Sequence, residues 1–317
     1  MKNEIKSTNE LNKPIEFNNF NLLKKYFSGT HTEKTLKDYY YNFTRFLNFL
    51  ENTFEINSVK EIKENHVLAY ISHLKNEKEL KNSTINTYIA AFRFFFKRAQ
   101  SQYPDLKDPT KNISKLKSDY FDPEDVLSLN HQDIKDMINY IDVKDQKSYR
   151  NKMILKTLYY TGMRSDELRS LKYENLVEID GQLRIKLFKT KSQKQQYIPL
   201  KSYFIDDILK YKNDIKVLFK FNNMNEKYVF PSYFLKNKKM TNSGLNKIIK
   251  KIAKPVIGKE ISAHNFRHAI ITILLLKGVS LENVSDFARH SNIKTTRNYD
   301  RAIEVKKAKT VGEIPDL

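Results

Sequence analysis

Cysteine is absent from this 317-residue chain, which excludes disulfides, thiolate chemistry and cysteine zinc sites. Nothing in the composition therefore calls for an oxidising compartment. Long apolar runs are missing too, because the most apolar stretch, residues 269–276, falls far short of the ~18 residues that a membrane-spanning helix needs. The first residues contain no apolar segment typical of a secretory signal. We therefore expect a soluble, cytoplasmic protein with no membrane partner.

Glycine is scarce, at seven residues, so we do not expect a glycine-rich backbone cradle for phosphate groups. The sequence contains neither a Walker-type loop nor a GxGxxG motif. It also lacks HExxH and aspartate-rich metal loops. No motif therefore predicts chemistry driven by ATP or by a metal, and we expect no cofactor.

Acidic residues are in deficit. The chain has 57 lysines and arginines against 37 aspartates and glutamates, which gives a formal net charge of +20. A surplus of this size repels itself unless an anionic partner neutralises it. Nucleic acid is the first candidate partner, and an anionic membrane surface is the second.

The chain is long enough for two domains, and 40% hydrophobic residues are enough to form real cores. Leu36, Phe43 and Leu50 belong to an apolar stripe with helical spacing, and Thr32 is a plausible N-cap of that helix. A second apolar stripe with helical spacing begins at Ile85, and its cap is expected at residue 82 or 83. A shorter helix is expected at residues 66–74, between these two helices. Three prolines within residues 101–123 predict an exposed linker. We expect a domain boundary near residue 118.

The second part opens with Asn130, which is expected to cap a helix with Asp133 in its first turn. Helical patterns continue to about Arg169. Residues 183–188 and 196–200 then alternate like two short strands joined by a polar turn, which predicts a hairpin. The remainder again has a helical pattern. The expected fold is mainly α with a small antiparallel β hairpin or sheet.

Four segments contain residues that could do chemistry: TGMRSDEL (161–168), the hairpin KTKSQKQQYIPL (189–200), HNFRH (264–268) and ARHSNIKTTRNY (288–299). Taken alone, each segment can be explained without any catalytic role. Arg164 and Glu167 could form a surface ion pair at a helix start. The HxxR pattern is frequent by chance, and a lysine in a turn is normally just solvated. One tyrosine among 19 is normally a packed aromatic.

Taken in chain order, these segments closely resemble the motifs of the tyrosine recombinase (phage integrase) family. The resemblance covers roughly residues 125–305, and the overall length is similar to that of simple, Xer-type members. The N-terminal helical part also looks like the core-binding domain of the family. The resemblance implies a core-binding domain in residues 1–118 and a catalytic domain in residues 119–317, which together form a C-shaped clamp on DNA.

The family resemblance implies transesterification at a DNA phosphodiester. Arg164 and Arg267 would neutralise the non-bridging oxygens, since guanidinium groups stay charged and can donate bidentate hydrogen bonds. They would supply the electrostatic stabilisation that a metal supplies elsewhere. His264 would donate a hydrogen bond to a non-bridging oxygen, and Glu167 would orient Arg164.

The same resemblance implies that Tyr299 is the nucleophile and forms a 3′-phosphotyrosyl intermediate. A cationic pocket is expected to lower the cost of ionising its hydroxyl, whose ordinary pKa is about 10. His290 would contact the phosphate or help to deprotonate the tyrosine. Lys191, in the hairpin turn, would protonate the 5′-hydroxyl leaving group.

Basic residues are expected to contact phosphates on opposite sides of a duplex, although a solvated basic face is the alternative. These residues are Arg93, Lys97, Arg98, Lys236, Lys238, Lys239, Lys247, Lys250 and Lys251. The tail after Arg301 cannot fold alone, and the resemblance implies that it docks on a neighbouring protomer. The expected assembly is a homotetramer on double-stranded DNA with two inverted half-sites.

One departure from the family pattern lies in ARHSNIKTTRNY, where Ala288-Arg289 stands before His290 in place of the usual Leu-Gly. Arg289 puts the local backbone in question and adds a charge near the site. It removes no catalytic group. The leading hypothesis is a site-specific recombinase that serves DNA integration, excision or chromosome or plasmid dimer resolution. Alternatives are a topoisomerase or resolvase with the same chemistry, and a non-catalytic DNA-binding regulator on the same scaffold.

Overall fold

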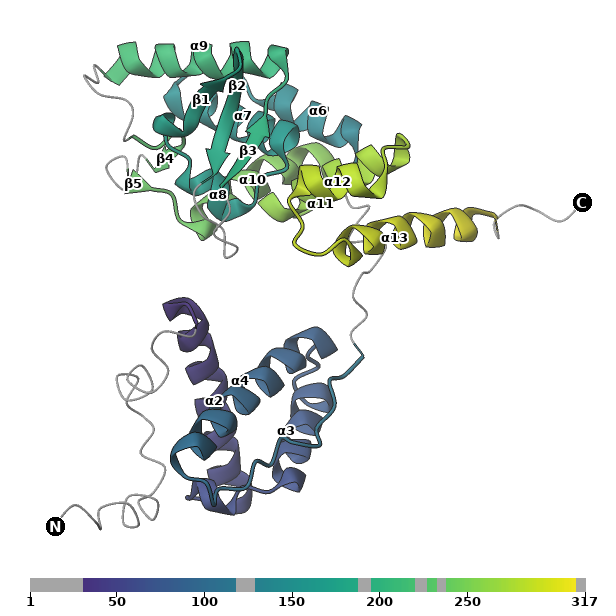
Figure 1. Ribbon diagram of the computed structural model, residues 1–317. Helices are drawn as coiled ribbons and strands as arrows, with labels where there is room; N and C mark the ends of the chain where they lie inside the picture. The colour runs from purple at the N-terminus through teal and green to yellow at the C-terminus, as the bar shows by residue number, and fades with distance from the viewer. Residues whose placement is uncertain (1–30, 118–128, 188–194, 220–226, 233–237, 312–317) are drawn as a thin grey trace, which may run out of the picture. The chain divides into compact units, whose positions relative to one another are not determined.

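The computed structural model describes residues 31–117, 129–187, 195–219, 227–232 and 238–311. The chain divides into two compact units, Met1–Tyr120 and Phe121–Leu317 (Figure 1). The boundary expected near residue 118 falls among residues 118–128, outside the described part of the chain. Helices dominate both units and short antiparallel strands occur in the second, so the expected fold class is confirmed.

Unit 1 is a small helical bundle. Its described elements are α2 (Glu33–Phe54), the short 3₁₀ helix η1 (Val59–Glu61), α3 (Glu64–Asn76) and α4 (Asn82–Gln102). Thr32 caps α2 as predicted, since its hydroxyl accepts a hydrogen bond from the Thr35 N–H at 3.3 Å. The prediction that residue 82 or 83 caps α4 was wrong, because the N-cap residue is Lys81. The Asn82 amide instead donates to the Lys117 carbonyl, 2.7 Å away, and ties the following chain to the helix.

Aromatic rings fill the core of unit 1, where α2 packs against α4. Phe43 stacks on Phe95 with ring centroids 4.0 Å apart, and Phe46 stacks on Phe92 at 4.5 Å. Such pairs add specific geometry to the burial of apolar area. The stripe predicted on α2 points into this core, with Leu36, Phe43 and Leu50 all buried.

Unit 2 begins with the predicted capping arrangement. The Asn130 side chain accepts from the Asp133 N–H, and the Asp133 carboxylate accepts from the Asn130 N–H, each at 2.9 Å. The helices of this unit are α6 (His131–Tyr140), α7 (Gln146–Thr161), α8 (Ser165–Ser170), the 3₁₀ helix η2 (Tyr173–Asn175), α9 (Ser202–Phe219), α10 (Asn242–Ile257), α11 (Ala263–Leu276), α12 (Leu281–Ala288) and α13 (Lys294–Val311).

The three-stranded sheet of unit 2 has the order β1-β2-β3 and is antiparallel throughout. Its strands are β1 (Leu176–Ile179), β2 (Gln182–Leu187) and β3 (Gln196–Pro199), and a second ladder joins β4 (Pro231–Ser232) to β5 (Lys238–Lys239). Ile185 pairs with both Leu176 and Ile198, which confirms the predicted β2–β3 pairing. Strand β1 was not predicted. Its partner is reached through a two-residue turn at Asp180-Gly181, where both φ angles are positive, 53° and 70°.

The C-terminal helices form the part of unit 2 that carries most of the predicted catalytic residues. α11 packs against α7, α12 and α13, and α12 also packs against α13 (Figure 1). Phe266 and Ala269 of α11 are fully buried in the main core. The segment after Arg301 continues as part of helix α13 through Val311, and its docking on a neighbouring protomer stays a prediction. None of the helices in the described ranges is long and apolar enough to cross a bilayer.

Candidate active site

The turn between α7 and α8 brings Arg164 to the site. Gly162 ends α7 with a φ of +55°, and a Cβ there would lie 3.1 Å from the Phe287 ring and 3.3 Å from Ile270. Both observations explain glycine at this position. Arg164 follows as the N-cap of α8. Its N–H and its guanidinium donate to the two carboxylate oxygens of Glu167, at 2.8 and 2.9 Å, so the predicted pairing of these residues is present.

Arg267 lies on the buried side of α11 with only 2% of its surface exposed. Its guanidinium donates to the Gly162 carbonyl at 2.7 Å and to the Ala288 carbonyl. Burial lowers the pKa of Arg267 to about 10, with smaller effects from the charges of Arg164 and Arg289. The group therefore remains protonated at neutral pH, and it is fixed to both segments that flank the site.

The histidines of the site favour their neutral forms. Burial, together with the charges of Arg267 and Arg164, lowers the pKa of His290 to about 4. The Nδ1 of His290 lies 2.8 Å from the Thr296 hydroxyl, and its main-chain N–H donates to the Ser285 carbonyl at 3.0 Å. Desolvation and the same two arginines lower the pKa of His264 as well. At neutral pH the positive charge of the site therefore belongs to its arginines.

Tyr299 lies on α13 and is 2% exposed, in a cluster with Ile271, Val284 and Ala288. Its ring stacks near His290, with centroids 6.3 Å apart. Burial raises the pKa of Tyr299 to about 12, although Arg267 and Arg164 act in the opposite direction. The expectation of easier ionisation was therefore right for the arginines and wrong for the net effect in the DNA-free chain, because desolvation of the phenolate outweighs both charges.

The predicted catalytic residues in the described part of the chain come together around Tyr299. Arg164 and Arg267 are both near enough to influence the ionisation of Tyr299 and of His290. Lys191 lies among residues 188–194, outside the described residues. Groups of three or more metal-ligating side chains were not found within the described ranges.

The basic residues expected to bind DNA differ in their surroundings. Lys239 pairs with Asp166 at 3.1 Å, and Lys250 pairs with Glu260 at 2.8 Å. The exposed lysines of this set are Lys97, Lys238, Lys247, Lys250 and Lys251, whereas Arg98 is half-buried and Lys236 lies outside the described residues.

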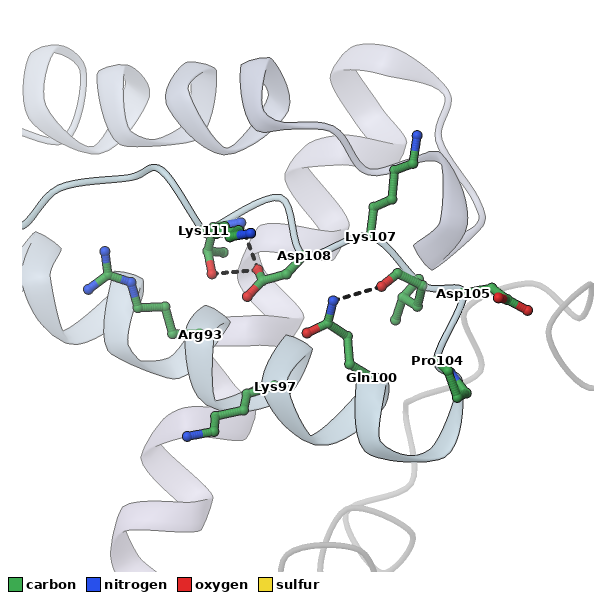
Figure 2. Close-up of a pocket in the computed structure, with 10 residues that line it drawn as sticks. Arg93, Lys97, Gln100, Pro104, Asp105, Lys107, Asp108 and Lys111 are labelled. Atoms are coloured by element: carbon green, nitrogen blue, oxygen red, sulfur yellow. Dashed lines mark hydrogen bonds between the residues drawn. The ribbon is translucent and has the colours of Figure 1, made fainter.

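Arg93 and Lys97 line an open pocket of about 720 Å³ in unit 1 (Figure 2). Lys107 and Lys111, from the segment after α4, complete its basic lining. Arg93 donates to the Ile113 carbonyl and so helps to fasten that segment to the helix. Asp108 accepts hydrogen bonds from the N–H and hydroxyl of Thr110, at 2.8 and 2.7 Å, which shapes the turn between the two lysines.

Two residues of the site were not assigned from the sequence. His268 lies between His264 and Tyr299, with ring centroids 4.1 and 5.2 Å away. Its spacing of four residues from His264 on one helix was the available signal. Arg289 ends α12 and donates to Glu167 at 3.2 Å. Its departure from the family pattern is visible in the sequence, but its contacts across more than a hundred residues have no signature there.

Comparison with protein families agrees with this arrangement. Residues 128–304, more than half of the chain, match the model of the "Phage integrase family", and residues 21–104 match "Phage integrase, N-terminal SAM-like domain". The chain belongs to the phage integrase family, whose members are tyrosine recombinases. This assignment confirms the resemblance that the four motifs indicated.

Curated relatives of this family member cover most of its length. It is 29% identical over 268 residues to tyrosine recombinase XerC of Bacillus pumilus, covering 84% of this chain and 85% of the relative. It is also 29% identical over 272 residues to the TnP I resolvase of Bacillus thuringiensis, covering 84% of this chain and 89% of the relative.

Solved structures with the same fold include XerH site-specific recombinase bound to a palindromic difH substrate in a post-cleavage complex. Its TM-score is 0.70 at 23% identity, covering 88% of this chain and 80% of that one. A lambda integrase dimer bound to a COC′ core site has a TM-score of 0.66 at 12% identity, covering 90% of this chain and 77% of that one. These similarities establish the fold of this phage integrase family member.

Proposed function

We propose that this protein is a site-specific DNA recombinase that cleaves and rejoins strands through a 3′-phosphotyrosyl intermediate. The observation that carries the proposal is the convergence of Arg164, Arg267, His264 and His290 on a single buried tyrosine, Tyr299. Family membership supports the same chemistry.

Arg164 and Arg267 are proposed to bind the non-bridging oxygens of the scissile phosphate. Guanidinium groups make strong bidentate partners for phosphate oxygens, and the backbone and carboxylate contacts of these two orient them before DNA arrives. Preorganised donors of this kind stabilise the extra negative charge of a pentacoordinate transition state. His264, one turn before Arg267, is proposed to add a hydrogen bond to the same oxygens.

Tyr299 is proposed to attack the phosphorus through its hydroxyl oxygen. The new oxygen–phosphorus bond forms as the bond to the 5′ oxygen breaks, so the number of phosphodiester bonds is unchanged and no ATP is consumed. His290 is neutral at pH 7, because burial and the nearby arginines lower its pKa to about 4, and it is proposed to take the phenolic proton as the attack on the bound phosphate proceeds. The released 5′ oxygen needs a proton, and Lys191 is proposed to donate it. Attack by the 5′ hydroxyl of a partner strand reverses these steps and rejoins the DNA.

The high pKa of Tyr299 is compatible with its proposed role as the nucleophile, because the bound phosphate changes its surroundings. Burial opposes the phenolate, while the two arginines favour it. A bound phosphodiester excludes water and brings the developing charge within reach of both guanidinium groups. Ionisation is therefore expected to accompany attack rather than precede it.

The basic pocket of unit 1 is proposed to contact the DNA backbone as part of a core-binding domain. Lys97, Lys107 and Lys111 are exposed around it and offer ammonium groups to phosphates. Together with the lysines of α10 they are proposed to form the two sides of a C-shaped clamp. We propose domain limits of 1–118 and 119–317 for this arrangement.

A homotetramer on two inverted half-sites is the proposed assembly, with the segment after Arg301 docking on a neighbouring protomer. Integration, excision and dimer resolution all use this chemistry. A topoisomerase would relax any supercoiled plasmid, whereas a recombinase requires two cognate sites. A non-catalytic regulator is disfavoured, because the catalytic residues in the described part of the chain are all retained.

Covalent trapping tests the proposal. Wild-type protein and the Tyr299→Phe variant are incubated with nicked suicide duplexes drawn from DNA beside the gene, without divalent metal, and run on a denaturing gel. We expect a shifted protein–DNA band for the wild type and none for the variant. Tight DNA binding with no covalent band for the wild type on any duplex would favour the regulator.

A further inference from the structure

Arg289 is an unusual end for a helix. It is the C-cap of α12 and has a φ of +55° and a ψ of 46°, a left-handed conformation in which glycine is the least strained residue. Only 6% of its side chain is exposed. A buried charge in a strained backbone position is costly unless its contacts compensate for both.

The Arg289 guanidinium connects the end of α12 to the α7–α8 turn. It donates to the Thr161 and Gly162 carbonyls, each at 3.4 Å, and to the Phe287 carbonyl at 2.9 Å. The Gly162 carbonyl also accepts from Arg267 at 2.7 Å. One carbonyl is therefore shared by Arg289 and by an arginine that we propose to bind the phosphate.

Glu167 links Arg289 to the other phosphate-binding arginine. One carboxylate oxygen of Glu167 accepts from the Arg164 guanidinium at 2.9 Å. The other accepts from the Arg164 N–H at 2.8 Å and from Arg289 at 3.2 Å. The Arg164 guanidinium also donates directly to the Arg289 carbonyl, at 3.1 Å. The three side chains and two backbone groups form a closed network.

The contacts of the Arg289 guanidinium are made to protein oxygens, and only a small part of the side chain is exposed. Arg289 shares the Glu167 carboxylate with Arg164. It shares the Gly162 carbonyl with Arg267. Loss of its guanidinium would therefore disturb both phosphate-binding arginines. The Ala288 carbonyl next to it, which accepts from Arg267, moves with the same helix end.

We propose that Arg289 is a positioning residue of the recombinase reaction. It fastens the end of α12 to the α7–α8 turn through Glu167, and thereby fixes Arg164 and Arg267 in the orientation that receives the scissile phosphate. The inference rests on the proposed function, because the reaction is its readout.

The experiment compares Arg289→Gly, Arg289→Asn and Arg289→Lys with the wild type. Glycine removes the guanidinium and relieves the backbone strain, asparagine tolerates the left-handed conformation, and lysine keeps the charge without the planar array of donors. Melting temperature, DNA affinity and the rate constant of covalent complex formation at saturating protein are measured on one suicide duplex.

We expect Arg289→Gly and Arg289→Asn to bind the duplex as the wild type does and to melt at a similar temperature, while the rate constant falls at least tenfold. Arg289→Lys should recover part of the rate. In a Glu167→Gln background, the further loss from Arg289→Gly should be small, because the two residues act through one contact.

Three results would overturn the inference. The first is a wild-type rate constant in folded Arg289→Gly or Arg289→Asn protein. The second is a rate loss in every variant that follows a matching fall in melting temperature. The third is full additivity with Glu167→Gln. A wild-type protein that forms no covalent complex would instead contradict the proposed function, so the two failures are distinguishable.

Discussion

Arginines make most of the contacts that connect distant parts of the site. Arg267 bonds to the carbonyls of Gly162 and Ala288, which are separated from it by 105 and 21 residues. Several donors on one planar group allow a single side chain to fasten two segments while retaining N–H groups for a phosphate. The four motifs predicted these residue types, but these long-range backbone contacts depend on how α7, α11 and α12 pack.

Gly162 provides a prediction at this scale. Gly162→Ala combines a left-handed φ with a Cβ 3.1 Å from the Phe287 ring, so we expect a loss of about 2 kcal/mol or more in the free energy of unfolding. Gly181→Ala is the matched control, since its φ is +70° but no atom lies within 4 Å. It should cost only about 1 kcal/mol, from the backbone alone. Equal losses in urea titrations would contradict the role of the close contact.

His268 provides a second prediction. Burial lowers its pKa to about 3, against an ordinary value near 6.5. As pH falls below 6.5 the unfolded chain therefore takes up the proton first, and stability declines progressively toward pH 3. We expect the melting temperature to fall by several degrees between pH 7 and pH 4.5.

The control separates His268 from the other titrating groups. His268→Gln should reduce this pH dependence without abolishing it, because His290 and His264 titrate in the same direction. The exposed His131→Gln should leave it unchanged. The same slope in all three proteins would show that His268 does not drive the acid sensitivity.

Elements whose periodicity is clear are the ones that the sequence predicts well. The α2 stripe, the Asn130 capping box and the β2–β3 pairing all follow from local patterns. Strand β1 escapes prediction because its four residues alternate too briefly to be distinguished from a loop. The effect of the arginines on the Tyr299 pKa could be predicted, but its net rise could not, because the sequence reveals nearby charges and not the depth of burial on α13.

The pocket between α4 and the following segment gives a prediction for an element. We expect the double variant Lys97→Ala and Lys107→Ala to weaken DNA binding and to reduce the slope of log affinity against log salt by about 1 to 2, in line with one lost phosphate contact for each lysine. The control, Lys60→Ala with Lys78→Ala, removes two exposed lysines of the same unit outside the pocket. Fluorescence anisotropy at several salt concentrations measures both slopes. Identical slopes for the two variants would exclude the pocket from the DNA contact.

The whole molecule combines a net charge of +20 with a site in which burial and arginine charge oppose each other at one tyrosine. The first property accounts for attraction to a polyanion of any sequence, and the second confines the chemistry to one residue. The chain has 19 tyrosines. The proposed function therefore requires that a single one of them form the covalent bond to DNA.

Mass spectrometry of the trapped complex tests this requirement most directly. After nuclease digestion, trypsin cleavage at Arg297 and Arg301 releases the peptide Asn298–Arg301, which contains Tyr299 as its one tyrosine. We predict that this peptide carries the residual 3′-phosphonucleotide and that tyrosines elsewhere carry none. A nucleotide adduct on another residue, with Tyr299 unmodified, would contradict the account.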